Sequence, residues 1–310
     1  MRVLVVTSYN NGAVAPFIAE QVDALRRRGV ICEYYLLTGT GWSGYLRNLP
    51  PLKAAIRQFR PDVIHAHYGL CGLLCTLQRQ VPVVTTFHGS DINDRRVRPL
   101  SMLAYRRSAH SIFVSRALAR RCHATERGST VLPCGVDTEL LAPMERGEAR
   151  RRLSLRPEQP LVLFAGAYDD PVKNISLARA AMAYVPEARL IELRGYSREE
   201  TAALFNAVDL LLMTSHSEGS PQVVKEALAC NCPVVSVDVG DVREQIDGVD
   251  GCCVVQRDSR SIAQAIKKRI RHPLHRHGRS RLTERGLDNM NTAKKLQSIY
   301  SAVGEKAHHL

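Results

Sequence analysis

The sequence contains 310 residues, which is enough for two domains at roughly 100–200 residues per domain. Apolar residues make up 45% and charged residues 24%, a globular composition that excludes intrinsic disorder, collagen and coiled coil. The net charge of +13 favours anionic partners, but aromatic residues make up only 5% and no stacking motif accompanies the arginines, so nucleic-acid binding is not expected. No apolar run approaches 18 residues, which argues against a transmembrane helix.

The N-terminal segment and the cysteines both indicate a cytoplasmic protein. Met1–Thr7 holds one basic and five apolar residues, a run too short for a signal peptide and typical of a first buried strand. The nine cysteines show neither a disulfide framework nor a zinc spacing. We therefore expect small core cysteines that stay reduced.

Short β-rich runs alternate with helical patterns in the first half of the chain. The predicted strands are Val3–Val6, Cys32–Leu37, Val63–Ile64, Val83–Phe87, Ile112–Val114 and Val131–Leu132. Helical patterns cover about Ala15–Arg28, ending at Gly29, and Leu70–Leu77. Because Val-rich runs separated by helices are typical of strands buried on both faces, we expect a parallel sheet.

The second half repeats this layout after a change of character. Pro133–Pro160 is rich in proline and includes the charged stretch Glu145–Arg152, which predicts a linker. Beyond it, the predicted strands are Leu161–Phe164, Leu190–Leu193, Leu210–Met213, Val234–Val237 and Val254–Val255, and the predicted helices are Ile175–Val185, one opened by the capping box Ser197–Glu200, Gln222–Ala229 and Ile262–Ile270. We thus predict two doubly wound α/β domains, residues 1–140 and 150–288, that face each other across a cleft and bind ligands beyond the carboxyl ends of their strands.

The most informative segment is Ser217–Ala229, which follows a predicted buried strand. Ser220 and Pro221 are expected as the N-cap and the first helical residue, so the next amides form a seat for a diphosphate. Gly219 lets a ligand approach the backbone. Glu218 and Glu226 can face the same ligand at two depths, where carboxylates accept hydrogen bonds from sugar hydroxyls. On spacing alone, these glutamates could also merely complement the helix dipole or stay solvated.

The paired glutamates, with Gly219 after the first and Ala-Leu-Ala after the second, resemble the signature of glycosyltransferase family 4. Further segments that resemble motifs of this family are Pro61–His67, Thr86–Asp91, Leu132–Asp137, Cys232–Val235 and Asp238–Glu244. Their order and spacing cover roughly residues 1–260. The resemblance implies the GT-B fold of two Rossmann-like domains, retention of anomeric configuration and no metal. It also implies that a closing helix, residues 289–310, packs back on the first domain.

The resemblance also implies roles for individual residues. Glu226 would bind the donor ribose and Glu218 the donor sugar, while the backbone at Gly219, Ser220, Pro221 and Gln222 would hold sugar and diphosphate. Lys173 would pair with the diphosphate, His88 would lie near the sugar, and Gly12 would let the first loop approach the diphosphate. The alternatives are a solvated lysine for Lys173, a structural hydrogen-bonder for His88 and an ordinary turn at Gly12.

Two departures from the family pattern affect the donor site. Ala167 stands where family members usually carry an arginine that pairs with the diphosphate, so one cation is missing or another arginine replaces it. The glycine pair of the first loop is reduced to Gly12. His65 and His67 have the spacing of a metal pair, but no third ligand is evident and no metal is expected.

We therefore expect a metal-independent, cofactor-free, retaining glycosyltransferase of polysaccharide or cell-envelope glycan biosynthesis. It would move a sugar from a nucleotide-diphosphate donor to a hydroxyl of a glycan or lipid-linked acceptor. The missing arginine at Ala167 leaves open a non-catalytic GT-B partner protein, and a nucleotide-sugar epimerase is a further alternative. The basic amphipathic stretch Trp42–Arg60 could contact an anionic membrane or form a partly buried helix.

Overall fold

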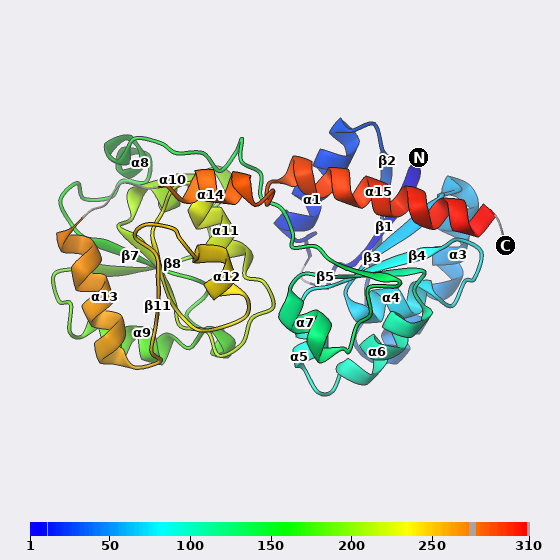
Figure 1. The fold of residues 1–310 in the computed structure, drawn as a ribbon, viewed down its shortest axis with the longest axis horizontal. Helices are drawn as coiled ribbons and strands as arrows, with labels where there is room; N and C mark the ends of the chain where they lie inside the picture. The colour runs from blue at the N-terminus through cyan, green and yellow to red at the C-terminus, as the bar shows by residue number, and fades with distance from the viewer. Residues whose placement is uncertain (11, 273–276, 309–310) are drawn as a thin grey trace. The chain divides into compact units, whose positions relative to one another are not determined.

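The structure is a computed structural model that describes residues 1–10, 12–272 and 277–308. Its backbone contacts divide the chain into two compact units (Figure 1). Unit 1 comprises Met1–Gly135 together with Asn289–Leu310, and unit 2 comprises Val136–Asp288. Each unit is built on its own parallel β-sheet, as the sequence predicts.

Unit 1 contains a six-stranded parallel sheet in the order β2-β1-β3-β4-β5-β6. Its strands are β1 Arg2–Ser8, β2 Ile31–Leu37, β3 Val63–His67, β4 Val83–Phe87, β5 His110–Phe113 and β6 Ser129–Val131. Its helices are α1 Pro16–Arg27, α2 Gly41–Leu46, α3 Leu49–Phe59, α4 Gly69–Cys75, α5 Ser90–Asn93, α6 Arg98–Arg107, α7 Arg116–Arg121 and α15 Asn289–His308. Val3 and Val5 pack in one core with α1 and α15, whereas Leu4 packs in another with α3 and α4. This alternation is the reason why β1 is apolar at each position from Val3 to Val6.

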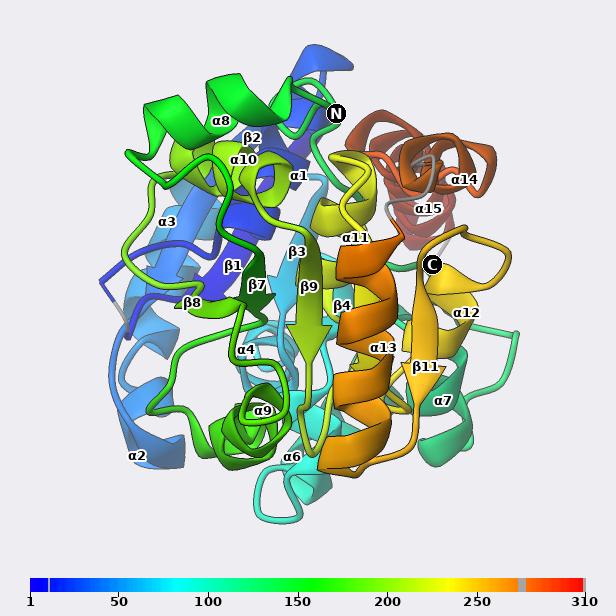
Figure 2. The same ribbon diagram turned by 90° about the vertical axis from the view of Figure 1, so that its left-hand side faces the viewer.

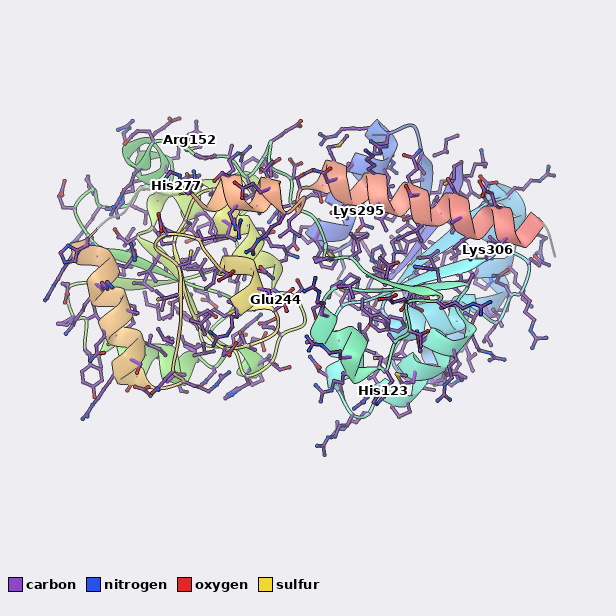
Figure 3. All side chains as sticks on the ribbon, in the orientation of Figure 1. His123, Arg152, Glu244, His277, Lys295 and Lys306 are labelled. Atoms are coloured by element: carbon purple, nitrogen blue, oxygen red, sulfur yellow. The ribbon has the colours of Figure 1, made fainter. Side chains whose placement is uncertain are left out.

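Helix α15 completes unit 1 although it is the last element of the chain. It runs beside α1 (Figure 1), and its Leu296 and Tyr300 are buried in the same core as Val3 and Val5. Its exposed face carries Lys295 and Lys306, which are labelled in Figure 3. The predicted end of this helix at residues 309 and 310 lies outside the described residues.

Unit 2 contains a five-stranded parallel sheet in the order β11-β10-β9-β7-β8. Its strands are β7 Leu161–Phe164, β8 Arg189–Glu192, β9 Leu210–Met213, β10 Val234–Val237 and β11 Cys253–Val255. Its helices are α8 Arg146–Arg152, the 3-10 helix η1 Pro171–Lys173, α9 Ile175–Met182, α10 Arg198–Ala207, α11 Gln222–Ala229, α12 Val242–Ile246, α13 Ser259–Arg271 and α14 Gly278–Glu284. Helices α9 and α13 pack together, and α13 also contacts β10 and β11 (Figure 2).

The predicted linker is wrong over most of its length. Val136 and Leu141 are fully buried in the core of unit 2, which therefore begins before the predicted boundaries at residues 140 and 150. The charged stretch Glu145–Arg152 forms helix α8, with the Glu145 side chain as its N-cap. Arg150 is 2% exposed because its guanidinium donates hydrogen bonds to the carbonyls of Ala207 and Arg156. Proline and charge density did not distinguish this packed segment from a solvated one.

The amphipathic stretch Trp42–Arg60 turns most of its large apolar side chains away from solvent. It forms α2 and α3, and Tyr45, Leu52, Ile56 and Phe59 are buried in the same core as residues of β1 and β3. These buried side chains match the partly buried alternative, whereas Leu46 is 38% exposed and contact with a membrane stays a prediction. Among the described residues, no helix combines the length and the apolar character that a membrane span requires.

Candidate functional site

Predicted donor-site residues of unit 2 meet in loops beyond the carboxyl ends of its strands. The chain leaves β7 for β8 on one side and returns to β9 on the other, which makes β7 and β9 the topological switch point of this sheet. Lys173 follows β7 and Glu218 follows β9, and the Lys173 Nζ lies 2.7 Å from the Glu218 Oε1. Their side chains are 23% and 14% exposed, so this ion pair is largely withdrawn from water.

Two neighbouring residues, Thr214 and Gly166, fix the position of Lys173. The Thr214 hydroxyl, just after β9, donates to the Lys173 carbonyl at 2.9 Å. Gly166 has a φ of +154°, and a Cβ at this position would lie 2.7 Å from the Lys173 Cγ. Only glycine at position 166 leaves room for the methylene groups of Lys173, which extend past it so that the ammonium group reaches Glu218.

Glu218 is held from the opposite side by the loop after β10. Gly240 has a φ of +58°, and a Cβ there would lie 3.1 Å from both the Glu218 Cβ and the Gly219 carbonyl oxygen. A glycine is required at this position for its left-handed backbone and for this close approach. The loops after β7, β9 and β10 thus converge on one carboxylate.

The second predicted carboxylate has a cationic partner that sequence reasoning missed. Arg198, the first residue of α10, donates to the Glu226 Oε1 through its terminal nitrogen at 2.9 Å. The side chains of Arg198 and Glu226 are 25% and 10% exposed. The capping box of Ser197 and Glu200 fixes the start of α10 and hence the origin of the arginine side chain. Ala167 itself offers no cation, so Arg198 is a candidate for the arginine that the family pattern lacks here.

Helix α11 has the predicted bounds Gln222–Ala229, but its N-cap is not the predicted Ser220. Pro221 is its N-cap, with an extended ψ of 116°, and Gln222 is the first helical residue. Ser220 does not cap the helix, because its hydroxyl contacts the Gln245 Nε2 at 3.2 Å and the Lys225 Nζ at 3.4 Å. Because no side chain caps its start, α11 keeps its first amides facing the loop that carries Gly219.

Lys225 is a fully buried lysine behind this loop, beside Asp241, which is 9% exposed. Burial raises the pKa of Asp241, and the charge of Lys225 and hydrogen bonds from Ser220 and Gln245 oppose this rise. These groups connect the Ser220 loop with α11 and α12. Sequence reasoning missed them because a lysine and an aspartate in these motifs look like ordinary surface residues.

In unit 1, the loop after β4 is clamped by a buried carboxylate. Asp91 is 4% exposed and accepts hydrogen bonds from the backbone amides of His88, Gly89 and Gly69 at 3.1, 2.9 and 3.1 Å. Burial raises its pKa to about 6, although these amides act in the opposite direction. The Gly89 φ of +120° completes the tight turn. This clamp fixes the backbone of the predicted site residue His88.

The His88 ring lies among side chains of unit 1. Its Nε2 is 3.0 Å from the His67 Nδ1, and its Nδ1 is 3.8 Å from the Cys134 Sγ. The rings of Tyr68 and Phe17 lie 4.7 and 5.1 Å from it, measured between ring centroids. These contacts match the structural alternative for His88, while its contact with a donor sugar stays a prediction.

The first loop of unit 1 borders a cavity of about 470 Å³. Gly12 has a φ of +72° and donates its amide to the Tyr9 carbonyl at 3.0 Å, which is the geometry of a turn. A Cβ on Gly12 would meet nothing within 4 Å, so the glycine is needed for its backbone angle alone. The cavity is lined by uncharged residues: Thr7, Ser8, Asn10, Ala13, Val14, Ala15, Pro16, Tyr45 and Tyr68.

Sequence models of two glycosyltransferase families match successive parts of the chain. The model described as Glycosyltransferase Family 4 matches residues 2–140, and the model described as Glycosyl transferases group 1 matches residues 162–272. The chain belongs to the family 4 glycosyltransferases of the group 1 type. This confirms the resemblance of the paired-glutamate segment and its companion motifs.

Curated relatives carry names of sugar-transferring enzymes. The D-inositol 3-phosphate glycosyltransferase of Mycobacterium marinum is 29% identical over 260 residues, which cover 68% of this chain and 56% of the relative. The putative teichuronic acid biosynthesis glycosyltransferase TuaC of Bacillus subtilis is 27% identical over 244 residues, which cover 68% of this chain and 62% of the relative. The chain thus spans little more than half the length of these relatives.

Similar solved structures extend over both units. Sucrose-phosphate synthase from Thermosynechococcus elongatus has a TM-score of 0.83 at 17% identity and covers 97% of this chain and 98% of its own. Alr3699/HepE from Anabaena, in complex with UDP and glucose, has a TM-score of 0.76 at 18% identity and covers 97% of this chain and 99% of its own. At such identities the likeness concerns the fold alone, and it confirms the predicted GT-B class.

Within the described part of the chain, no three His, Cys, Asp or Glu residues are arranged to hold a metal ion. His65 and His67, the predicted non-metal pair, are fully buried and contact other side chains of unit 1. Metal-independent activity stays a prediction.

Proposed function

We propose that the protein is a retaining, metal-independent glycosyltransferase that uses a nucleotide-diphosphate sugar and acts on a hydroxyl of a glycan or lipid-linked acceptor. This proposal is carried by two ion pairs in unit 2. Lys173 pairs with Glu218, and Arg198 pairs with Glu226. Each pair holds one cation that would serve a diphosphate and one carboxylate that would serve sugar hydroxyls. Family membership supports the same chemistry.

In the proposed reaction, the bond between the anomeric carbon and the diphosphate oxygen breaks while the acceptor oxygen bonds to the same face of that carbon. The hydroxyl proton passes to the departing diphosphate, so charge and atoms balance without a metal. Lys173 and the first amides of α11 stabilise the charge that develops on the leaving group. Glu218 orients the donor sugar through its hydroxyls, and Glu226 does so for the ribose.

Arg198 supplies the cation that is missing at Ala167. The Arg198 guanidinium contacts one carboxylate oxygen of Glu226, and the second oxygen of Glu226 would accept a hydrogen bond from a ribose hydroxyl. The contact with Glu226 also orients the guanidinium. Arginine suits this role because its fork-shaped donor set matches phosphate oxygens. The non-catalytic alternative rests on Ala167, and a functional Arg198 would remove its motivation.

The acceptor binds in the cavity of unit 1 beside Gly12. Hydroxyl groups of Thr7, Ser8 and Tyr45 and the ring of Tyr68 line it, which is a surface typical of sugar binding. The name of TuaC associates that relative with teichuronic acid biosynthesis, which supports a polysaccharide or cell-envelope acceptor. A cytoplasmic location, with peripheral contact at an anionic membrane, stays a prediction.

A thermal-shift panel tests the donor site directly. UDP, GDP, ADP and CMP are added to wild type, Glu226→Ala and Glu244→Ala, an exposed glutamate on α12 that serves as the matched control (Figure 3). A ligand at ~100 times its Kd stabilises the native state by about 2.7 kcal/mol. UDP is the first candidate because HepE binds UDP and UDP-glucose. One nucleotide should stabilise wild type and Glu244→Ala but not Glu226→Ala.

Turnover then separates the enzyme from the non-catalytic alternative. Donor sugars of the nucleotide that binds are incubated with glycan and lipid-linked acceptors, and the anomeric configuration of the product is read by NMR. Retention of configuration supports the proposal, and inversion contradicts it. Nucleotide binding without transfer or donor hydrolysis across the panel would favour the non-catalytic partner protein.

A further inference from the structure

A chain of ring contacts links the C-terminal helix of unit 1 to His88. The Tyr300 hydroxyl on α15 lies 2.6 Å from the His65 Nδ1, and the His65 Nε2 lies 2.7 Å from the Thr86 Oγ1. The His65 and His67 rings are 4.3 Å apart between centroids. The His67 Nδ1 then meets the His88 Nε2 at 3.0 Å. Segments that are 235 residues apart in the sequence thereby contribute to one buried network.

His67 differs from His65 in one respect. Both side chains are fully buried, but both nitrogens of His65 have hydroxyl partners, whereas the His67 Nε2 has no hydrogen-bond partner among the described residues. Burial and the neighbouring rings of His65 and His88 lower the pKa of His67 well below its usual 6.5, so the ring is neutral near neutral pH. A neutral imidazole carries one proton, on either Nδ1 or Nε2.

The lack of a partner for the His67 Nε2 determines which ring nitrogen of His67 carries this proton. A buried N–H group without an acceptor costs free energy, and an unmet acceptor is tolerated more often than an unmet donor. His67 therefore carries its proton on Nδ1, where the His88 Nε2 accepts it. The His67 and His88 rings are inclined by only 23° with centroids 5.2 Å apart, a geometry in which the two nitrogens face each other.

The geometry points to His67 as a positioning residue that fixes His88 as a neutral imidazole with its proton on Nδ1. The His88 Nε2 is an acceptor in this arrangement, so the ring proton occupies Nδ1 and points toward the Cys134 Sγ. A doubly protonated His88 would donate from Nε2 and would force the His67 proton onto the orphaned Nε2. The network therefore opposes a charged His88.

This arrangement has a consequence for the reaction that rests on the proposed function. Both ring nitrogens of His88 are directed at side chains of unit 1, so His88 does not act as a general base through its ring. His88 would instead contribute a fixed, uncharged ring surface beside Tyr68 and Phe17. The tautomer itself does not depend on the protein being a glycosyltransferase.

Side-chain ¹⁵N NMR of the full chain labelled at its histidines tests the tautomer without any substrate. The chain has 11 histidines, and the signals of His88 are assigned by their loss in His88→Gln. Wild type at pH 7 should show His88 with a protonated Nδ1 and an unprotonated Nε2. A protonated Nε2, or an imidazolium, in wild type would overturn the inference.

Two variants of equal polarity separate a positioning role from simple packing. His67→Asn places an amide where Nδ1 was and should preserve the His88 tautomer. His67→Gln places its amide nearer the orphaned Nε2 and should shift His88 toward the Nε2-protonated form. Tyr300→Phe controls for a loosened network, because it removes a hydroxyl that does not touch His88. If the Asn and Gln variants give the same His88 spectrum, His67 does not set the tautomer.

The NMR readout also keeps this inference separate from the proposed function. A confirmed tautomer in a protein that binds no nucleotide would refute the proposed glycosyltransferase and leave the His67 network intact. Conversely, nucleotide binding and sugar transfer by a protein whose His88 is protonated on Nε2 would refute the tautomer and support the proposed glycosyltransferase.

Discussion

Removal of the Arg198 guanidinium should weaken nucleoside diphosphate binding by about 10- to 100-fold. Its contact with Glu226 is a charge-assisted hydrogen bond of 2.9 Å between side chains that are 25% and 10% exposed. The proposed hydrogen bond from this guanidinium to a phosphate oxygen would contribute roughly 1.5–3 kcal/mol, and each 1.4 kcal/mol corresponds to about tenfold in affinity. Arg198→Ala removes this contact and a cation for the diphosphate, and it leaves a carboxylate in a partly buried position without its cation.

Isothermal titration calorimetry of the nucleotide found in the thermal-shift panel measures this effect. Arg198→Ala should weaken binding of the diphosphate more than binding of the corresponding nucleoside, because only the diphosphate needs the second cation. Since Arg198 and Glu226 act as a unit, the double variant with Glu226→Ala should be less impaired than the sum of the two single variants. A change of less than twofold in the diphosphate affinity of Arg198→Ala, with binding abolished in Glu226→Ala, would contradict this role of Arg198.

Two further predictions concern the backbone that holds the site in each unit. Gly166→Ala should displace Lys173 and weaken diphosphate binding. The control Gly195→Ala should cause backbone strain alone, because Gly195 has a φ of +82° and nothing lies within 4 Å of the new Cβ. Equal diphosphate Kd values for the two variants by calorimetry would contradict this prediction. The free energy of unfolding of the wild type should fall by about 3 kcal/mol as the pH rises from about 4 to about 6. The reason is that the pKa of Asp91 rises from 3.8 to about 6 on folding, so the folded state binds one more proton than the unfolded state between these pH values. Urea unfolding at several pH values should show this slope in wild type but not in Asp91→Asn, and a slope of opposite sign would mean that the backbone amides outweigh burial.

The sheets were predictable because their strands are buried on both faces. The predicted runs Leu161–Phe164, Leu210–Met213 and Val234–Val237 coincide with β7, β9 and β10, since continuous apolar runs of this length have few alternative structures. Helix α6 was missed because its only fully buried side chains are Ser101 and Ala104, which give almost no hydrophobic periodicity. Proline and charge suggested a linker where buried Val136 and Arg150 begin unit 2.

The site divides in the same way into local and nonlocal features. Glu218 and Glu226 lie in one short segment, so their spacing and family resemblance single them out. Arg198 is 28 residues from Glu226 in the sequence, and nothing local marks it, because its role arises where the start of α10 meets the side of α11. Similarly, the orphaned nitrogen of His67 depends on which strand and which loop its ring faces. Such features exist only once the chain has folded.

The charges of unit 2 suit the proposed nucleotide sugar better than a sugar or a phosphate alone. Lys173 already has Glu218 as a partner, and Arg198 already has Glu226. A phosphate alone would draw a cation from its carboxylate and leave that carboxylate partly buried and unpaired, which is costly. A sugar alone would compete with a cation for a carboxylate it cannot neutralise. A nucleotide sugar offers phosphate oxygens to the cations and hydroxyls to the carboxylates in the same event, so each group that loses a partner gains another.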